Sequence, residues 1–305
     1  MLRTDNMADT LDPRFQQILD ERFTNLPDVV EKFYSFKSAK LITERFSTIG
    51  TMDDVPRFLG SVDYDDVYQG YDVAVTPLEY AKGIQIQRRL FDTDQHDKIE
   101  SKPKALSGAL FRTRQKFAAR PFNFAFGVDN YFYNHTEGVS LCSNSHTTTS
   151  MASTSSGFDN LVTTSLNPVT YTAALFQMYN FRGDRAEKIT VRPNMLVIPK
   201  APAIAEAAHE IVKSSSYPNQ SNSGVSNYNQ GTTEVFEWIE LNSTTNWFMI
   251  DSTMMKDQGL YWLDAVKAEM KMMEDFDTLV MKHRLYAVWA NMWLDWRWVL
   301  GASVS

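Results

Sequence analysis

Two residues in a loop-like stretch of the sequence could act as a nucleophile and its base. Cys142 and His146 lie four residues apart among many serines and threonines, and a thiol beside an imidazole is the pairing that cysteine hydrolases use. Reacting atoms have to be held in place, however, and a flexible polar loop holds them poorly. We therefore interpret the pair as a chance proximity and keep a soluble hydrolase as the alternative from the enzyme class.

A group of carboxylates near the end of the chain is the second candidate for chemistry. These side chains could bind a cation or act as paired acid and base: Glu269, Glu274, Asp275 and Asp277. Because a strand-like stretch follows them, we interpret the group as a solvated acidic turn. The histidines are scattered, and the sequence has no HExxH, CxxC, P-loop, GxGxxG or GxSxG pattern. The sequence therefore predicts no enzyme, no cofactor and no metal site.

The composition is that of a globular chain without a nucleic-acid signature. The 305 residues are 43% hydrophobic and 22% charged, and the net charge is −7, which gives no overall basic surface for phosphates. A single cysteine excludes an internal disulfide. The first residues lack an apolar signal segment, and no apolar run is long enough to span a membrane. We expect a chain made in a reducing compartment, with no membrane partner.

The beginning of the chain predicts one or two short helices over residues 9–36, broken at Pro27. Phe15 and Phe23 belong to an apolar stripe at helical spacing. This leading segment has little core of its own, so its partner must lie elsewhere. Two interpretations stay open: the stripe docks on the chain's own body, or the segment is an arm that reaches a neighbouring subunit.

Residues 50–91 predict an extended polar hairpin. The segment is rich in aspartates, among them Asp63, Asp65 and Asp66, and two strand-like stretches follow over 72–76 and 83–90. We interpret these stretches, the second of which contains Arg88, as a two-stranded excursion without a continuous apolar face. Such a hairpin is marginal in water unless something covers it. An ordinary sheet edge is the alternative.

Residues 97–120 predict a long helix with an apolar stripe and a basic face. The stripe consists of four side chains: Leu106, Leu110, Thr113 and Phe117. The basic face has four others: Arg112, Arg114, Lys116 and Arg120. Pro121 is expected to stop the helix, and a strand over 122–126 is expected to follow. A charge run of this kind is usually a solvated face. The alternative prediction is that the basic face of one copy meets the acidic hairpin of a neighbouring copy.

The middle of the chain predicts a compact unit of alternating helices and strands. A Ser/Thr/Gly-rich loop over 136–166 precedes a helix that opens at Asn167-Pro168. A buried strand over 192–199, a helix from Pro202 and strands over 235–241 and 247–250 follow. This order describes an α/β or α+β unit set between an earlier and a later part of a different body.

The last part of the chain predicts a half-buried strand rich in tryptophan. Apolar residues alternate with polar ones over 279–289, and Trp296, Trp298 and Leu300 then alternate with Arg297. Side chains this large at the end of the chain are expected to be tied into a core or an interface. This placement favours assembly over catalysis.

From about residue 37 onward the order of these pieces resembles tailed-bacteriophage major capsid proteins with the Hong Kong 97-type fold. The resemblance is nearest to the Mu-like major head subunit branch. It rests on the blocks Arg192-Pro-Asn-Met-Leu-Val-Ile-Pro199, Asn246-Trp-Phe-Met-Ile-Asp251, Gly259-Leu-Tyr-Trp262 and the stretch from Asp275 to Val299.

The resemblance implies an α+β fold in six parts. These are an N-terminal arm (1–38), a first piece of the peripheral domain (39–49), an extended loop (50–91), a peripheral piece with a spine helix (92–135), an axial domain (136–256) and the peripheral C-terminal strands (257–305). Within these parts the inter-subunit candidates are Phe15, Phe23, Asp63, Asp65, Asp66, Arg88, Arg112, Arg114, Lys116 and Arg120.

The resemblance also implies a function. The chain would assemble through hexamers and pentamers in the cytoplasm of a bacterial host, into an icosahedral head that encloses double-stranded DNA. Portal, scaffolding and decoration proteins would be its other partners, and DNA contact would be weak and non-specific. Nothing marks a covalent cross-link near Lys82. An encapsulin-like nanocompartment shell is the alternative within the fold.

Overall fold

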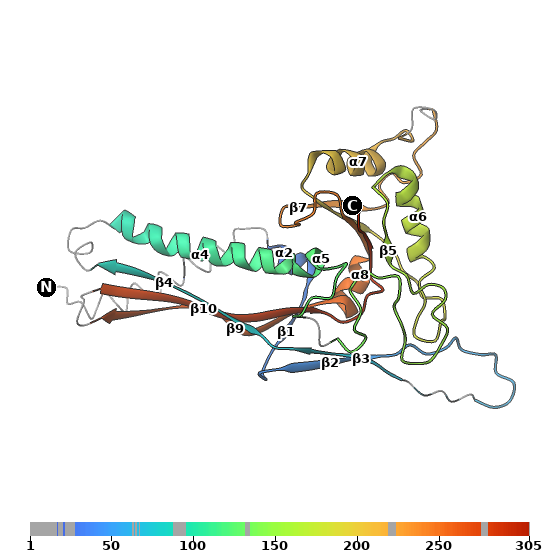
Figure 1. Cartoon of the computed structure of the whole chain (residues 1–305), viewed down its shortest axis with the longest axis horizontal. Coiled ribbons are helices and arrows are strands. Elements are labelled where there is room, and N and C mark those ends of the chain that lie inside the picture. Colours follow the sequence, from blue (N-terminus) through green and yellow to red (C-terminus); the bar gives the residue numbers. More distant parts are fainter. Residues whose placement is uncertain are drawn as a thin grey trace.

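The computed structural model describes residues 28–304 except 63, 65, 67, 88–95, 132–134, 219–223 and 276–279, together with Gln17 and Glu21. The side chains of 96–100 and 274 also lie outside this description. Figure 1 shows a long arm that consists of strands and the helix α4, and a second unit of sheet and helices that lies at one end of the arm. A thin extension, which begins at β2 and β3, projects beside the place where the two meet. The predicted interface residues Phe15, Phe23, Asp63, Asp65 and Arg88 lie outside the described residues.

The arm is built on a four-stranded sheet in the order β1-β9-β10-β4. Its centre is an antiparallel pair of long strands, β9 (Leu260–Asp275) and β10 (Val280–Trp293). Strand β4 (Leu78–Gln87) pairs antiparallel with β10, and β1 (Ser35–Ser38) pairs parallel with β9. The predicted alternation on β10 is confirmed, because Met281, Leu285, Ala287 and Trp289 are all buried.

The predicted long helix is confirmed as α4 (His96–Ala118), which lies along β4 and β10 (Figure 1). Leu106, Leu110 and Phe117 of the predicted stripe are buried against the sheet. Thr113 is exposed, so the buried stripe is narrower than predicted. The apolar burial of this face holds the helix to the arm, since helices gain most of their stability from such packing.

The second unit is a five-stranded sheet in the order β5-β11-β8-β6-β7. Its strands are β5 (Leu161–Val162), β6 (Met195–Pro199), β7 (Glu234–Trp238), β8 (Trp247–Ile250) and β11 (Val299–Ala302). Helix α7 (Pro202–Lys213) contacts β6 and β7, and α6 (Pro168–Met178) contacts β11. The predicted helices after Asn167 and from Pro202 and the buried strand within 192–199 are therefore confirmed.

Short helices join the two units. Helix α2 (Val29–Phe33) begins at Asp28, whose side chain accepts a hydrogen bond from the Val30 N–H, and α8 (Ser252–Met254) leads into a π-helical turn (Met255–Gly259) before β9. Helix α5 (Arg120–Asn123) follows α4 directly. The strand predicted over 122–126 is therefore wrong, because Pro121 is accommodated in the first turn of a new helix instead of ending helical structure.

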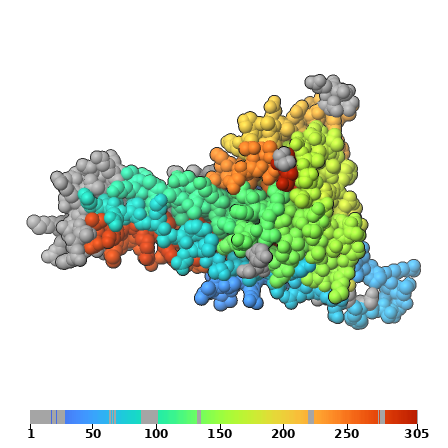
Figure 2. All heavy atoms as spheres, viewed as in Figure 1, coloured from blue at the N-terminus to red at the C-terminus, as the bar shows by residue number. Residues whose placement is uncertain are grey.

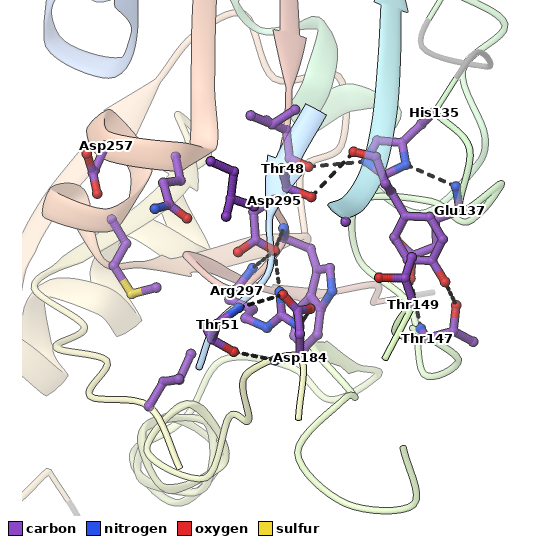
Figure 3. Close-up of a pocket in the computed structure, with 18 residues that line it drawn as sticks. Thr48, Thr51, His135, Glu137, Thr147, Thr149, Asp184, Asp257, Asp295 and Arg297 are labelled. Carbon is purple, nitrogen blue, oxygen red and sulfur yellow. Dashed lines mark hydrogen bonds and ion pairs between the residues drawn. The ribbon is translucent and has the colours of Figure 1, made fainter. Parts of the chain in front are cut away.

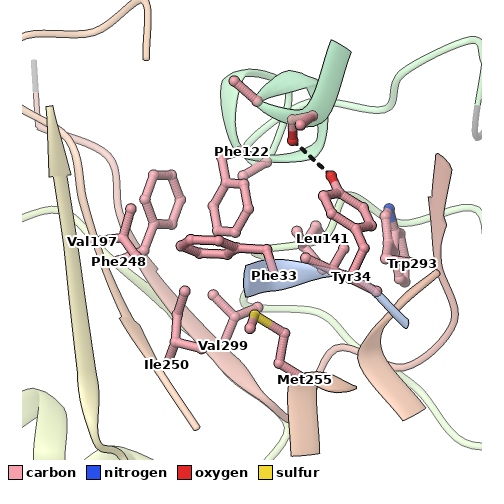
Figure 4. Packing of buried hydrophobic residues seen from close by; sticks show 14 of the residues in the cluster. Phe33, Tyr34, Phe122, Leu141, Val197, Phe248, Ile250, Met255, Trp293 and Val299 are labelled. Carbon is pink, nitrogen blue, oxygen red and sulfur yellow. Dashed lines mark hydrogen bonds between the residues drawn. The ribbon is translucent and has the colours of Figure 1, made fainter. Parts of the chain in front are cut away.

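The core at this junction is aromatic (Figure 4). The Phe33 ring lies 5.8 Å from that of Phe122 and 5.0 Å from that of Phe236, between ring centroids. Tyr34, the next residue, donates its hydroxyl to the Ala118 carbonyl at 2.6 Å. For residues 28–38, docking on the chain's own body is therefore observed, whereas the predicted arm before them lies largely outside the described residues.

The predicted hairpin between 72–76 and 83–90 is wrong in its pairing. Strand β3 (Gln69–Val75) pairs antiparallel with β2 (Glu44–Ile49), and β4 pairs with β10. The physical reason is burial: Ile86 of β4 is fully covered in the arm, which a polar two-stranded excursion would not provide. The excursion that exists is the β2–β3 pair with the connection between the two strands.

The last strand, β11, belongs to the five-stranded sheet. Strand β11 pairs antiparallel with β8 and parallel with β5, so 299–302 lie with the second unit and not with β9 and β10. Trp296 and Trp298 are buried as predicted, but 295–298 form a turn rather than a strand, and Arg297 is buried as well. The six-part division as a whole stays a prediction.

Buried His283 makes the arm's stability sensitive to acid. Burial lowers the pKa of His283 from 6.5 to about 4, so between these values the unfolded chain binds a proton that the folded chain does not. Stability is full above pH 6.5 and is lost as the pH falls toward 4, by up to about 3 kcal/mol. Urea unfolding of the His283→Met variant at pH 7, 5.5 and 4.5 should show a flatter pH dependence. Parallel curves for variant and parent would contradict the assignment.

Candidate inter-subunit surface

The connection between β2 and β3, residues 50–68, is here named the extended segment. Together with Ile49 at its start it carries a run of exposed apolar side chains: Ile49, Met52, Val55, Phe58, Leu59, Val62, Tyr64 and Tyr68. Val55 is 95% exposed and Leu59 is 84% exposed, and Figure 2 shows the segment projecting from the body. Contiguous exposed apolar surface of this kind marks a protein–protein contact.

These apolar residues are what the sequence interpretation missed. The prediction of a polar hairpin without a continuous apolar face rests on the aspartates and does not account for these side chains. The signal was present as an apolar residue at almost every third position between Met52 and Val62, interrupted by Pro56 and Gly60. Val55, Phe58, Leu59 and Val62 follow the helical spacing i, i+3, i+4 and i+7. Pro56 and Gly60 interrupt that run, and residues 50–62 form no helix.

The root of the extended segment is fixed to the body by Asp184 and Arg185. The Thr51 N–H donates to Asp184 Oδ2 at 3.2 Å, and the Asp184 N–H donates to Thr51 Oγ1 at 2.8 Å. Arg185 forms an ion pair with Asp53 at 3.0 Å and donates to the Asp66 carbonyl at 2.6 Å. The two ends of the segment are therefore held by one short stretch of the second unit, and its middle is left outside.

Asp184 is in turn held by the buried guanidinium of Arg297. Arg297 pairs with Asp184 at 2.8 Å and with Asp295 at 3.1 Å, and its Nε donates to the Arg182 carbonyl at 2.7 Å. Asp184 and Asp295 are themselves mostly buried. The loop between β10 and β11 thus reaches the root of the extended segment through a charge-assisted network.

A cavity of about 230 Å³ lies beside this network (Figure 3). His135 and Glu137 line one side, and Asp257, Asp295 and Arg297 line the other. His135 is stacked on Trp293 with 4.2 Å between ring centroids, and burial lowers its pKa. Among the described residues no cluster of histidine, cysteine or carboxylate side chains has the geometry of a metal site. Thr51 and Asp184 also line the cavity, which therefore lies at the root of the extended segment.

The basic residues predicted on the long helix have different surroundings. Arg114 lies 3.2 Å from the Asp28 carboxylate and 4.9 Å from the Trp262 ring centroid. Arg120 donates two hydrogen bonds to Asp129, at 2.5 and 2.7 Å. These two charges are therefore matched within the chain.

Arg112 and Lys116, in contrast, are exposed on α4. Of the three aspartates predicted as their partners, only Asp66 belongs to the described residues. Its backbone carbonyl accepts a hydrogen bond from Arg185 of the same chain. A contact between Arg112 or Lys116 and a neighbour's acidic residues stays a prediction.

The residues that suggested a hydrolase are not arranged as a nucleophile and base. Burial raises the pKa of the Cys142 thiol far above its usual range, and Gly301 of β11 leaves room for its sulfur. His146 lies 3.0 Å from Glu137 through Nδ1 and 3.3 Å from the Leu141 carbonyl through Nε2, stacked on Trp296. Both ring nitrogens are therefore occupied by other groups, and the thiol stays protonated at neutral pH.

In the part of the chain that the structure describes, no helix is both long enough and apolar enough to cross a membrane.

The carboxylates predicted as an acidic turn are in part strand residues, since Glu269 and Asp275 belong to β9. Asp275 pairs with Lys282 of β10 across the hairpin. Glu269 instead pairs with Lys271 of the same strand. Glu274 also belongs to β9, and Asp277 lies outside the described residues.

Solved capsid structures share the fold of this chain. The mature capsid of bacteriophage PhiM1 matches with a TM-score of 0.55 at 8% identity, over 92% of this chain and 88% of that one. The procapsid of bacteriophage JBD30 matches with a TM-score of 0.54 at 10% identity, over 98% and 76%. A virus-like particle from Pyrococcus furiosus matches with a TM-score of 0.52 at 7% identity, over 95% and 98%. The chain therefore has a Hong Kong 97-like fold.

Sequence comparison gives the family. No curated protein matches the chain. A family model described as phage capsid protein matches residues 70–301, a range that begins within β3 and includes the long helix, the five-stranded sheet and every strand of the arm's sheet except β1. Since that match covers well over half of the sequence, the chain belongs to this family of phage capsid proteins.

Proposed function

We propose that this protein is a major capsid protein of a tailed bacteriophage. Copies would assemble through hexamers and pentamers into an icosahedral head around double-stranded DNA. Family membership and the shared fold support a shell subunit. The Mu-like branch, cytoplasmic assembly, and portal, scaffolding and decoration partners belong to the same proposal.

The observation that carries the proposal is the extended segment. Its apolar side chains are exposed while its root is fixed by Asp184 and Arg185. Hydrogen bonds and ion pairs hold these apolar residues away from the core of their own chain. Another surface is therefore needed to cover them. A neighbouring copy, present at high concentration during assembly, supplies that surface in a repeating shell.

DNA contact in this proposal is weak. Phosphate binding requires clustered cations, but Arg114 and Arg120 are matched by Asp28 and Asp129 within the chain. The net charge of −7 also opposes strong attraction. A shell interior of this kind would let DNA enter and leave without being held.

Assembly of a variant in the extended segment tests the proposal. Replacing Phe58 and Leu59 with serine removes two exposed apolar side chains without changing the charge or the core. We expect the parent protein to elute in the void volume and to form shells in electron micrographs, whereas the double variant elutes as subunits or small oligomers with an unchanged thermal unfolding temperature. Met151→Asn is the matched control, because Met151 is exposed and has a left-handed backbone that asparagine tolerates.

Shells from the double variant at the parent's yield would rule out the segment as the carrier of assembly. The contents of the particles separate a phage head from a nanocompartment. Particles made together with a phage packaging apparatus should protect double-stranded DNA from nuclease, whereas a nanocompartment would hold a protein cargo.

A further inference from the structure

Helix α6 is apolar on two faces. Its inner face, with Tyr171, Leu175 and Met178, is buried in the second unit. Its outer face carries four residues spaced as one side of a helix: Val169, Ala173, Phe176 and Tyr179, the last at its C-cap. Val169 is 70% exposed and Phe176 is 61% exposed. A helix on the surface of an isolated globular unit normally has polar residues on this side.

The sequence around α6 is free of charge. No Asp, Glu, Lys, Arg or His occurs from Asn160 to Phe181, although 22% of the whole chain is charged. The helix is nevertheless well formed, because Asn167 accepts hydrogen bonds from the Val169 and Thr170 N–H groups and Pro168 occupies the first turn. Depletion of charge together with exposed aromatic residues is the composition of an interface core.

The position of α6 leaves this outer face open to other molecules. Figure 1 places the helix at the outer edge of the second unit, at the opposite end of the molecule from the far end of α4. The root of the extended segment is held separately, by Asp184 and Arg185. Figure 1 draws the extended segment on the lower side of the molecule, apart from α6, so the outer face of α6 and the extended segment are two different surfaces.

We infer that the outer face of α6 docks on a second copy of this chain and forms a contact separate from that of the extended segment. A second copy is the occupant because the family builds shells from repeated subunits, so an apolar flank recurs in every copy. A lipid surface fits poorly, since membrane-surface helices carry lysines and arginines on their polar side, and this region has none. The inference rests on the proposed shell function.

Two variants of Phe176 test the contact. Phe176→Asp places a charge at the centre of the face, and we expect it to lower the yield of particles at least about tenfold while the subunit unfolds at the parent temperature. Ala203→Asp, which adds the same charge at an exposed site on neighbouring α7, is the control and should assemble normally.

Phe176→Cys gives a readout that does not depend on loss of assembly. The natural thiol of Cys142 is buried, so a maleimide reagent reports on the introduced one. We expect its reaction to be at least about tenfold slower in particles than in dissociated subunits.

The outcomes separate this inference from the proposed function. Normal assembly of Phe176→Asp, or equal thiol reactivity in particles and subunits, would overturn the α6 contact. If the Phe58 and Leu59 double variant still fails to assemble in that case, the shell function stands. If both sets of variants assemble normally, the proposed role of the extended segment fails too. Should Phe176→Asp not fold, the thiol measurement alone decides.

Discussion

Replacing Arg297 with methionine is expected to lower the free energy of unfolding by about 3–5 kcal/mol. The guanidinium is buried between Asp184 and Asp295, so the substitution leaves two carboxylates facing each other without a counter-charge. Asp184 also fixes the root of the extended segment through Thr51. Guanidinium chloride unfolding measures the stability loss, and particle yield should fall together with it.

Arg284→Met is the matched control for this experiment. Arg284 is an exposed cation of β10, and exposed charges contribute little, so a change under about 1 kcal/mol is expected. A double variant, Arg297→Met with Asp184→Asn, should lose less than the sum of the two single losses because one orphaned charge is removed. Strict additivity would show that the two side chains do not act together.

Replacing Phe33 with alanine is expected to cost about 3–5 kcal/mol of folding stability. Its side chain is 0% exposed, and its ring centroid lies 4.9 Å from that of Trp238 and 5.0 Å from that of Phe236. The residue belongs to the segment before the arm's first strand and inserts into the second unit, so the cavity would open at their junction. Thermal unfolding of the isolated subunit measures the loss.

Phe36→Ala provides the comparison, since Phe36 lies three residues further on and is 46% exposed. Its loss should stay under about 1 kcal/mol. Similar losses for both variants would mean that Phe33 is not a core residue in solution. An effect of Phe33→Ala on assembly alone would instead place residues 28–38 in an arm that binds a neighbour.

The helices and the buried strands could be predicted from the sequence, because the residue patterns that specify them are local. Asn167 followed by Pro168 marks the start of α6 through its cap. The uninterrupted apolar run of 195–199 marks β6, which is buried along its whole length. The alternation on β10 gave the correct buried face as far as Trp289. In each of these cases propensity and burial agree.

Strand β9 could not be predicted from its own residues. Its second half, Ala265–Asp275, consists mainly of alanine, glutamate, lysine and methionine, which favour helix. Pairing with β10 on one side over almost the whole strand, and with β1 on the other side near its start, outweighs that preference. Strand β1 lies far from β9 in the sequence, and its Phe36 pairs with Trp262.

The interface candidates show the same limit. Arg114 and Arg120 were correctly placed on or beside a basic helix, but their partners Asp28 and Asp129 are defined only by the fold. Arg297 was expected to alternate outward, yet the turn over 295–298 directs it to Asp184. Ion pairs between distant segments leave no periodic trace in a sequence.

The place of β11 in the second sheet has a consequence for synthesis on the ribosome. Every other strand of that sheet is made earlier, yet β11 lies between β5 and β8, so the sheet stays open until residues 299–302 leave the exit tunnel. At about 5–20 residues per second, synthesis from β8 to β11 takes several seconds. During that time the edges of β5 and β8 that will pair with β11 have no partner strand. Translation thereby orders the events: β5 can join the other strands of this sheet only after residues 299–302 have been made.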